Sequence, residues 1–129
     1  MEAAEVVVSK RFVNPETGEP ELWKIKPITA KQHSALRRAC MTSEPVPGGK
    51  KGQYTQQLDS SAYQAKMCAA CTLYPDLNNT ELQNSYGVMG AEALIATMLT
   101  PGEFEDYSTK VLEFNGFSTK NELVEEAKN

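Results

Sequence analysis

The chain has 129 residues, of which 40% are hydrophobic and 23% are charged, an ordinary composition for a globular domain. No apolar run approaches the roughly 18 residues that span a bilayer, and the first residues carry acids where a signal peptide carries basic side chains. We therefore expect a single intracellular domain over residues 1–129, with neither a membrane span nor a secretion signal.

The net charge of −4 conceals two halves of opposite sign. Residues 1–58 hold nine Lys or Arg and six Asp or Glu, whereas residues 59–129 hold four and eleven. Such a chain can attract copies of itself or a charged protein partner, and the alternative is that both surfaces are simply solvated. Nucleic-acid binding is disfavoured, because the basic residues form pairs such as Arg37–Arg38 and no longer stripe.

Residues 1–28 contain two alternating apolar stretches that predict a β-hairpin. Val6 and Val8 alternate with polar residues in the first stretch, and Trp23 and Ile25 do so in the second. The NPETGEP segment between them has the Asn, Pro and Gly residues typical of a turn. An isolated hairpin is marginal in water, so we expect one face to pack on helices or on another chain.

The remaining residues, 29–129, are predicted to form a mainly helical part with about five helices. Thr100 followed by Pro101 is the strongest start signal, since proline is favoured at the first helical position. The expected helices cover residues 29–41, 60–74, 79–87, 88–99 and 100–116, followed by a last polar helix over 118–128. The predicted fold class is therefore α+β, with an N-terminal β-hairpin packed on the helical part.

Apolar residues recur at helical spacing in the three longest predicted helices after residue 59. These stripes are Tyr63, Met67, Ala70 and Tyr74; Val88, Ala91, Ile95 and Met98; and Phe104, Tyr107, Val111 and Phe114. Leu94 and Leu99 widen the second stripe beyond what one core contact needs.

Residues 43–57 hold two prolines, three glycines and two lysines. A phosphate-binding loop is disfavoured against a plain solvated loop, because Gln53 and Tyr54 stand where the G-x-x-x-x-G spacing requires a second glycine. We instead expect a mobile, mildly basic loop that can order on contact with an acidic partner.

Three cysteines and one histidine are the candidates for chemistry. Cys68 and Cys71 form a CxxC inside a predicted helix, away from the helix N-terminus that would activate a thiol, which favours buried core thiols. A zinc site made of His33, Cys40 and this pair is the sharper alternative, but His33 and Cys40 lie about 10 Å apart along one helix. No GxSxG or HExxH motif is present. We expect no enzyme activity, no cofactor and no metal.

The SYGVMGAEALIATMLTPGEF segment is the strongest candidate for a binding surface. Gly87 and Gly90 resemble a GxxG loop that contacts nucleic-acid phosphates, but no basic residues surround them. Two interpretations remain: a close helix–turn–helix packing that needs small residues, or an apolar surface for a partner helix. The candidate partner-binding residues are Val88, Met89, Leu94, Met98 and Leu99, with Lys50, Lys51 and Tyr54 from the loop.

Nearly the whole chain resembles one known family. The matching segments are SKRFV, IKPITAKQHSALRRAC, GKKGQYTQQLD, CTLYPDLNNTELQNSYGVMGAEALIATMLTPGEF and NGFSTKNELVEEAKN. They closely resemble the phage XkdN-like tail assembly chaperones, which are encoded in tailed phages and in prophages of Gram-positive bacteria. One departure is that family members often carry a further polar leader before the hairpin, whereas this chain begins almost at the strand.

The resemblance implies a protein without catalytic residues that binds the phage tape measure protein. It would keep that protein soluble in the cytoplasm of the bacterial host while the tail tube polymerises, and it would be absent from the mature virion. Contact with the tail tube protein is also compatible with this role. From its apolar surface we further expect the chain to self-associate. The alternatives are a small structural tail protein of the virion and, more remotely, a Cys/His metal-binding protein.

Overall fold

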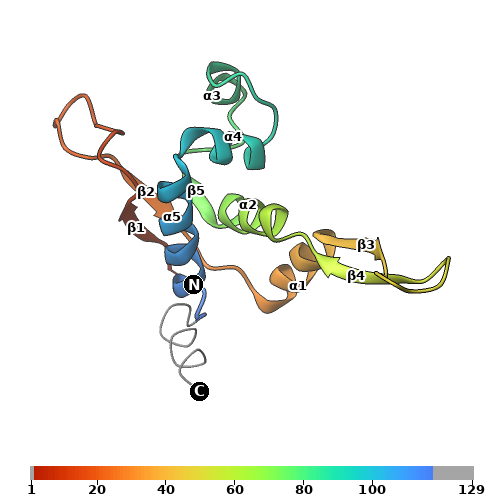
Figure 1. Cartoon of the computed structure of the whole chain (residues 1–129). Coiled ribbons are helices and arrows are strands. Elements are labelled where there is room, and N and C mark those ends of the chain that lie inside the picture. Colours follow the sequence, from red (N-terminus) through yellow and green to blue (C-terminus); the bar gives the residue numbers. More distant parts are fainter. Residues whose placement is uncertain (1, 118–129) are drawn as a thin grey trace.

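The computed structural model describes residues 2–117, which form five helices and two antiparallel sheets (Figure 1). The α+β class and the N-terminal β-hairpin are confirmed, and the helix predicted over 118–128 lies outside the described residues. In chain order the elements are β1 (Ala4–Val7), β2 (Leu22–Ile25), α1 (Ala30–Ala39), β3 (Met41–Pro45), β4 (Tyr54–Leu58), α2 (Ser60–Cys71), β5 (Thr72–Tyr74), α3 (Thr80–Ser85), α4 (Ala91–Met98) and α5 (Pro101–Phe114). In this part of the chain, every helix is too short or too polar to cross a membrane.

The predicted hairpin belongs to a three-stranded antiparallel sheet with the order β1–β2–β5. The alternation of β2 buries Trp23 and Ile25, which are 2% and 1% exposed, as the pattern of the sequence predicts. The rings of Phe12 and Tyr107 lie against the Trp23 indole, with centroids 5.7 and 5.3 Å away. The hairpin therefore packs its inner face directly on α5.

The third strand, β5, corrects the prediction of one helix over residues 60–74. Helix α2 ends at Cys71, and the chain continues as an extended strand that pairs with β2. Pro75 disfavours helical backbone at Tyr74, the residue before it. The amide N–H of Lys26 also donates to the carbonyl oxygen of Cys71 at 2.8 Å, which joins the end of α2 to the sheet.

The buried face of α2 also differs from the predicted stripe. Met67, Cys68 and Cys71 are buried, whereas Ala70 and Tyr74 are exposed. The helix packs against α4 and α5 together, and this contact draws the two cysteines inward. The stripe predicted for α2 was therefore correct only around Met67.

Helices α4 and α5 complete the core. Leu94 and Ile95 of α4 are 0% exposed, and Tyr107 and Val111 of α5 are 1% and 0% exposed. Thr100 caps α5 through a capping box, in which its hydroxyl accepts from an amide of the first turn. The start signal seen in the sequence is therefore confirmed.

Residues 43–57 are not a structureless loop but most of a β-hairpin that projects from the core (Figure 1). β3 and β4 pair antiparallel along their whole length, and residues 46–53 form the connection. The glycines lie in this connection, where Gly48 and Gly52 adopt φ values of 73° and 91°. The flanking residues, such as Thr55, favour strands. We call this hairpin the arm; its mobility stays a prediction.

Candidate functional site

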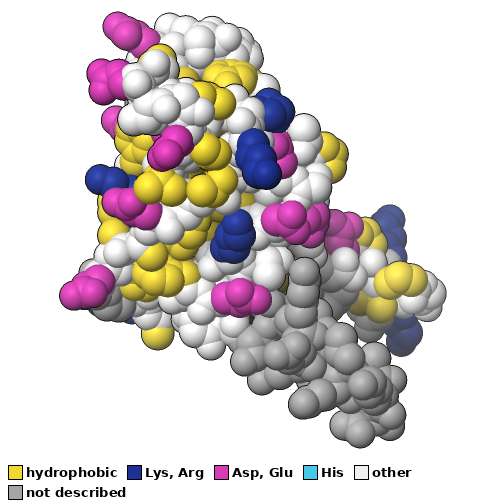
Figure 2. All heavy atoms as spheres, turned by 90° about the vertical axis from the view of Figure 1, so that its left-hand side faces the viewer, with side chains coloured by type: hydrophobic (Ala, Val, Ile, Leu, Met, Phe, Trp, Pro, Cys, Tyr) yellow, Lys and Arg dark blue, Asp and Glu magenta, His cyan; other side chains and the backbone are white. Residues whose placement is uncertain are grey.

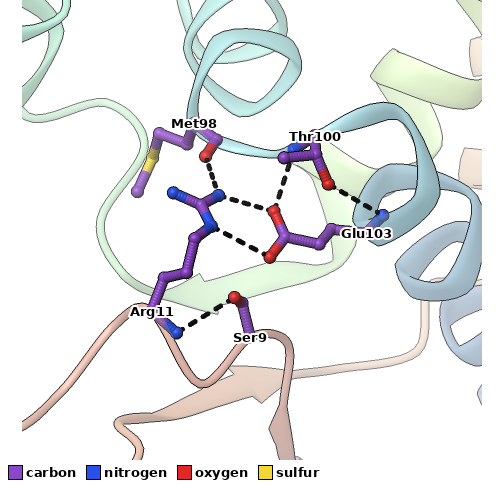
Figure 3. Close-up of polar contacts among 5 residues, drawn as sticks. All are labelled: Ser9, Arg11, Met98, Thr100 and Glu103. Carbon is purple, nitrogen blue, oxygen red and sulfur yellow. Dashed lines mark hydrogen bonds and ion pairs between the residues drawn. The ribbon is translucent and has the colours of Figure 1, made fainter.

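An ion pair fixes the segment after β1 to the start of α5 (Figure 3). The guanidinium of Arg11 donates from Nε and Nη2 to the two carboxylate oxygens of Glu103, at 3.1 and 2.5 Å. Its Nη2 also donates to the carbonyl oxygen of Met98 at 3.0 Å. Glu103 in turn accepts from the Thr100 amide at 2.9 Å. These hydrogen bonds, that of Arg11 above all, hold the pKa of Glu103 far below its ordinary value.

A groove of about 610 Å³ opens between the three-stranded sheet and α3. We call it the sheet–α3 groove. Three acidic side chains line it together with apolar ones, and no basic residue is among the described residues of its lining. The acids are Glu21, Asp76 and Glu81, and the apolar residues are Phe12, Trp23, Tyr74, Pro75, Leu82, Tyr86 and Met98. Such a combination suits an apolar ligand surface that also carries positive charge.

The loop between α3 and α4 presents a methionine to solvent close to this groove. The side chain of Met89 is 90% exposed, three residues after Tyr86 of the groove lining. The loop is held by Gln83, whose side-chain oxygen accepts from the Gly90 amide at 3.1 Å and whose carbonyl accepts from the Val88 amide at 3.1 Å. Met89 is therefore displayed by a hydrogen-bonded loop.

The outer face of the sheet exposes a second apolar area. Val7 and Leu22 lie directly opposite each other across β1 and β2, and they are 39% and 44% exposed. Glu5 and Lys24 form the next exposed pair along the strands. Viewed from the side of the hairpin, hydrophobic side chains gather in a band with acidic and basic side chains around it (Figure 2). Contiguous apolar surface of this kind marks contact sites in proteins.

The whole chain also matches a protein family. Residues 1–128 match the family model described as "Phage XkdN-like tail assembly chaperone protein". The chain belongs to this family. The resemblance that its segments show in the sequence is thereby confirmed.

Two relatives of this chaperone come from Bacillus subtilis (strain 168). The phage-like element PBSX protein XkdN is 32% identical over 130 residues, which cover 99% of this chain and 85% of XkdN. The protein YqbN is 32% identical over 127 residues, which cover 98% of this chain and 83% of YqbN. The crystal structure of YqbN has a TM-score of 0.73 at 28% sequence identity, and the match covers 91% of this chain and 87% of that one.

The residues predicted to bind a partner fall into separate places in this chaperone. Leu94, Met98 and Leu99 are 0%, 6% and 6% exposed, so in the free protein they belong to the core and offer no surface. Val88 is half-buried, and of these five candidates only Met89 is exposed. Leu94 and Leu99 widen the apolar face of the helix, and both lie in the buried core cluster.

The other three candidates lie on the arm, at the end of the molecule opposite to the N-terminal hairpin (Figure 1). Lys50 and Lys51 are exposed in the connection between the two strands, and Tyr54 is 63% exposed at the start of β4. They form a surface separate from Met89 and the sheet–α3 groove.

The three cysteines are buried and the histidine is partly buried. Cys68 and Cys71 are 1% and 0% exposed, as predicted for core thiols, and burial raises the pKa of Cys68 to about 11. A redox centre needs the opposite shift. His33 is partly buried, and its Nε2 hydrogen-bonds the Tyr63 hydroxyl at 2.6 Å. Within residues 2–117, no group of three His, Cys, Asp or Glu side chains is arranged to hold a metal ion.

The groove itself was not predicted, because its residues are far apart in the sequence. Tyr74 is the last residue of the predicted helix 60–74. Leu82 lies in α3, and Tyr86 is the C-cap residue of α3. The four-residue spacing of Leu82 and Tyr86 is a signal of an apolar helix face. It is a weak one in a helix of six residues.

Proposed function

We propose that this chaperone binds the tape measure protein of its phage and keeps it soluble while the tail tube assembles. It acts in the cytoplasm of the bacterial host, by protein–protein contact without catalysis, and does not remain in the mature virion. The family assignment supports a role in tail assembly. The burial of all three thiols supports binding rather than thiol chemistry, because buried thiols stay protonated and unreactive.

The sheet–α3 groove is the observation that carries this proposal. Aromatic and aliphatic side chains such as Tyr74, Leu82 and Tyr86 line it, and acidic side chains stand among them. An amphipathic helix fits such a groove by laying its apolar stripe inside and its flanking charges at the rim. We propose that the occupant is a helical segment of the tape measure protein whose apolar stripe is bordered by Lys or Arg.

Met89 extends this contact beyond the groove. A methionine side chain is flexible and polarisable, so it adapts to partners of different shape. A long tape measure protein presents many similar but unequal segments, and an adaptable contact can serve them in turn. Several weak contacts along one tape measure chain together give a stable complex, because after the first contact the others form at a high effective concentration.

The test is co-expression of this chaperone with the tape measure protein encoded beside it. We expect the wild-type chaperone to keep the tape measure protein in the soluble fraction and to co-purify with it. Met89→Lys places a charge on the apolar contact, of the same sign as the proposed partner, and should weaken the affinity about tenfold, which is about 1.4 kcal/mol. Val13→Lys is the matched control, since Val13 is an exposed apolar residue of the loop between β1 and β2.

The control should bind as the wild type does. If the tape measure protein stays insoluble beside the wild-type chaperone, the proposal is wrong. If Met89→Lys and Val13→Lys solubilise it equally well, Met89 is not part of the contact. The alternative of a structural tail protein predicts the chain in purified particles, which mass spectrometry of virions would detect.

A further inference from the structure

The hydrogen bonds of the arm show which backbone groups face outward. At its base the Asp59 amide donates to the Cys40 carbonyl at 2.8 Å, and at its far end the Val46 amide donates to the Gln53 carbonyl at 3.1 Å. In an antiparallel ladder, hydrogen-bonded pairs alternate with pairs whose N–H and C=O groups point away from the partner strand. Every second pair between these two positions therefore directs its backbone groups to the outer edges.

The register of β3 and β4 identifies these residues. The outward-facing residues are Met41, Ser43 and Pro45 on β3 and Tyr54, Gln56 and Leu58 on β4. Proline has no N–H, so the edge of β3 lacks a donor at one of its outward positions. The edge of β4 has a donor and an acceptor at each of them.

The other strand edges of the described chain are protected. β3 carries Pro45 and the charge of Glu44 at its end, and both discourage pairing. At the edge of β1, the Lys110 ammonium donates to the Val7 carbonyl at 3.0 Å. β5 has only three residues and is followed by Pro75. β4 is five residues long and contains neither a charge nor a proline, which leaves it the one unprotected edge of residues 2–117.

We propose that β4 pairs with β4 of a second copy of this chain, antiparallel and centred on Gln56, to join two arms into one four-stranded sheet. The pairing is self-complementary, because Tyr54 then faces Leu58 of the second copy and Leu58 faces its Tyr54. A Tyr–Leu pair across two strands is a favourable apolar contact, and the two facing Gln56 amides can bond each other. The proposal concerns the protein alone and does not rest on tape measure binding.

The charges of the arm favour the same orientation. Antiparallel pairing brings the tip of one arm beside the base of the other. The tip carries Lys50 and Lys51, and the residue directly after β4 at the base is Asp59. The strands that meet are themselves uncharged, so no like charges face each other across the new contact.

Two proline variants test the edge directly. Gln56→Pro removes an outward N–H from β4, and Ser43→Pro removes the equivalent N–H from β3; neither removes a hydrogen bond within the arm. We expect sedimentation velocity to show a concentration-dependent dimer for the wild type and for Ser43→Pro. For Gln56→Pro we expect a dimer dissociation constant at least tenfold higher, with unchanged Trp23 fluorescence as evidence that the core is folded.

A pair of charge variants keeps the test decisive if proline distorts the arm. Gln56→Lys and Gln56→Glu each place like charges face to face in a homodimer, so each alone should be monomeric. Mixed together they should form heterodimers. A wild type that stays monomeric at high concentration overturns the proposal, and so does a dimer that Gln56→Pro and Gln56→Lys leave unchanged. A mixture of the two charge variants that remains monomeric also contradicts it.

Discussion

The carboxylate of Glu103 accepts hydrogen bonds from both Arg11 and Thr100. It accepts the Thr100 amide at 2.9 Å and so completes the capping box of α5, and it receives two hydrogen bonds from Arg11. Arg11 is 52% exposed at its side chain, and exposed ion pairs usually contribute little to stability. The two-point geometry matters more, because it orients the chain after β1 relative to the start of α5.

The depressed pKa of Glu103 makes this contribution depend on pH. Because its pKa is lower in the folded than in the unfolded state, the unfolded state takes up the proton first as pH falls. The stabilisation is complete well above the ordinary value of 4.5 and declines as pH falls below it. We expect Glu103→Gln to lower the free energy of unfolding at pH 7, and its difference from the wild type to shrink progressively as the pH falls below 4.5.

Urea unfolding at pH 7, 5 and 3 would measure this difference. Glu105→Gln is a suitable control, since Glu105 lies on the same helix and is exposed. A gap between Glu103→Gln and wild type that is equally large at all three pH values would show that the charge is not its source.

Among the elements, those with strong local signals were predictable. Thr100 and Pro101 indicated the start of α5, and the alternation of apolar and polar residues around Trp23 indicated β2. β5 and the arm were missed because each depends on pairing with a strand elsewhere in the chain. The arm in addition ends β3 at Pro45, which fits the strand because the position of its missing N–H faces the free edge.

Some residues of the candidate site were predictable from the sequence and others were not. Met89 could be singled out from its own neighbourhood, since it stands between Gly87 and Gly90 in an apolar segment. The sheet–α3 groove could not, because Tyr74 and Leu82 approach each other only after the sheet forms. The burial of Leu94 could not be predicted either, since the same sequence pattern fits a core helix and a helix with an exposed apolar face.

Helix α4 belongs to the core, and truncation of one of its leucines should show this. Leu94 is 0% exposed, so Leu94→Ala removes buried methyl groups and leaves a cavity. We expect a loss of about 2–5 kcal/mol in the free energy of unfolding. Ala96→Ser, at an exposed position of the same helix, should change it by less than about 0.5 kcal/mol. Equal effects of both variants in chemical denaturation would place Leu94 outside the core.

The proposed partner binding and the proposed dimerisation involve two separate parts of the chain. The sheet, α3 and the Met89 loop form the surface proposed for the tape measure protein, whereas the arm extends from the other end of the molecule (Figure 1). The arm is exposed along nearly its whole length and packs chiefly on itself. Removing it should therefore leave the core and the sheet–α3 groove intact.

An armless variant tests this separation. Residues 43–56 are replaced by Asn-Gly, which forms a tight turn between the hydrogen-bonded pair of Thr42 and Gln57. We expect a folded monomer whose free energy of unfolding changes by no more than about 1 kcal/mol, since loop length enters only logarithmically. It should still hold the tape measure protein in solution, but with lower apparent affinity because a dimer binds two segments of one long partner.

Sedimentation velocity would measure the oligomeric state of the armless variant, chemical denaturation its stability, and co-expression its binding of the tape measure protein. A variant that unfolds would make the arm part of the core, and a folded variant that no longer binds would move the binding surface to the arm.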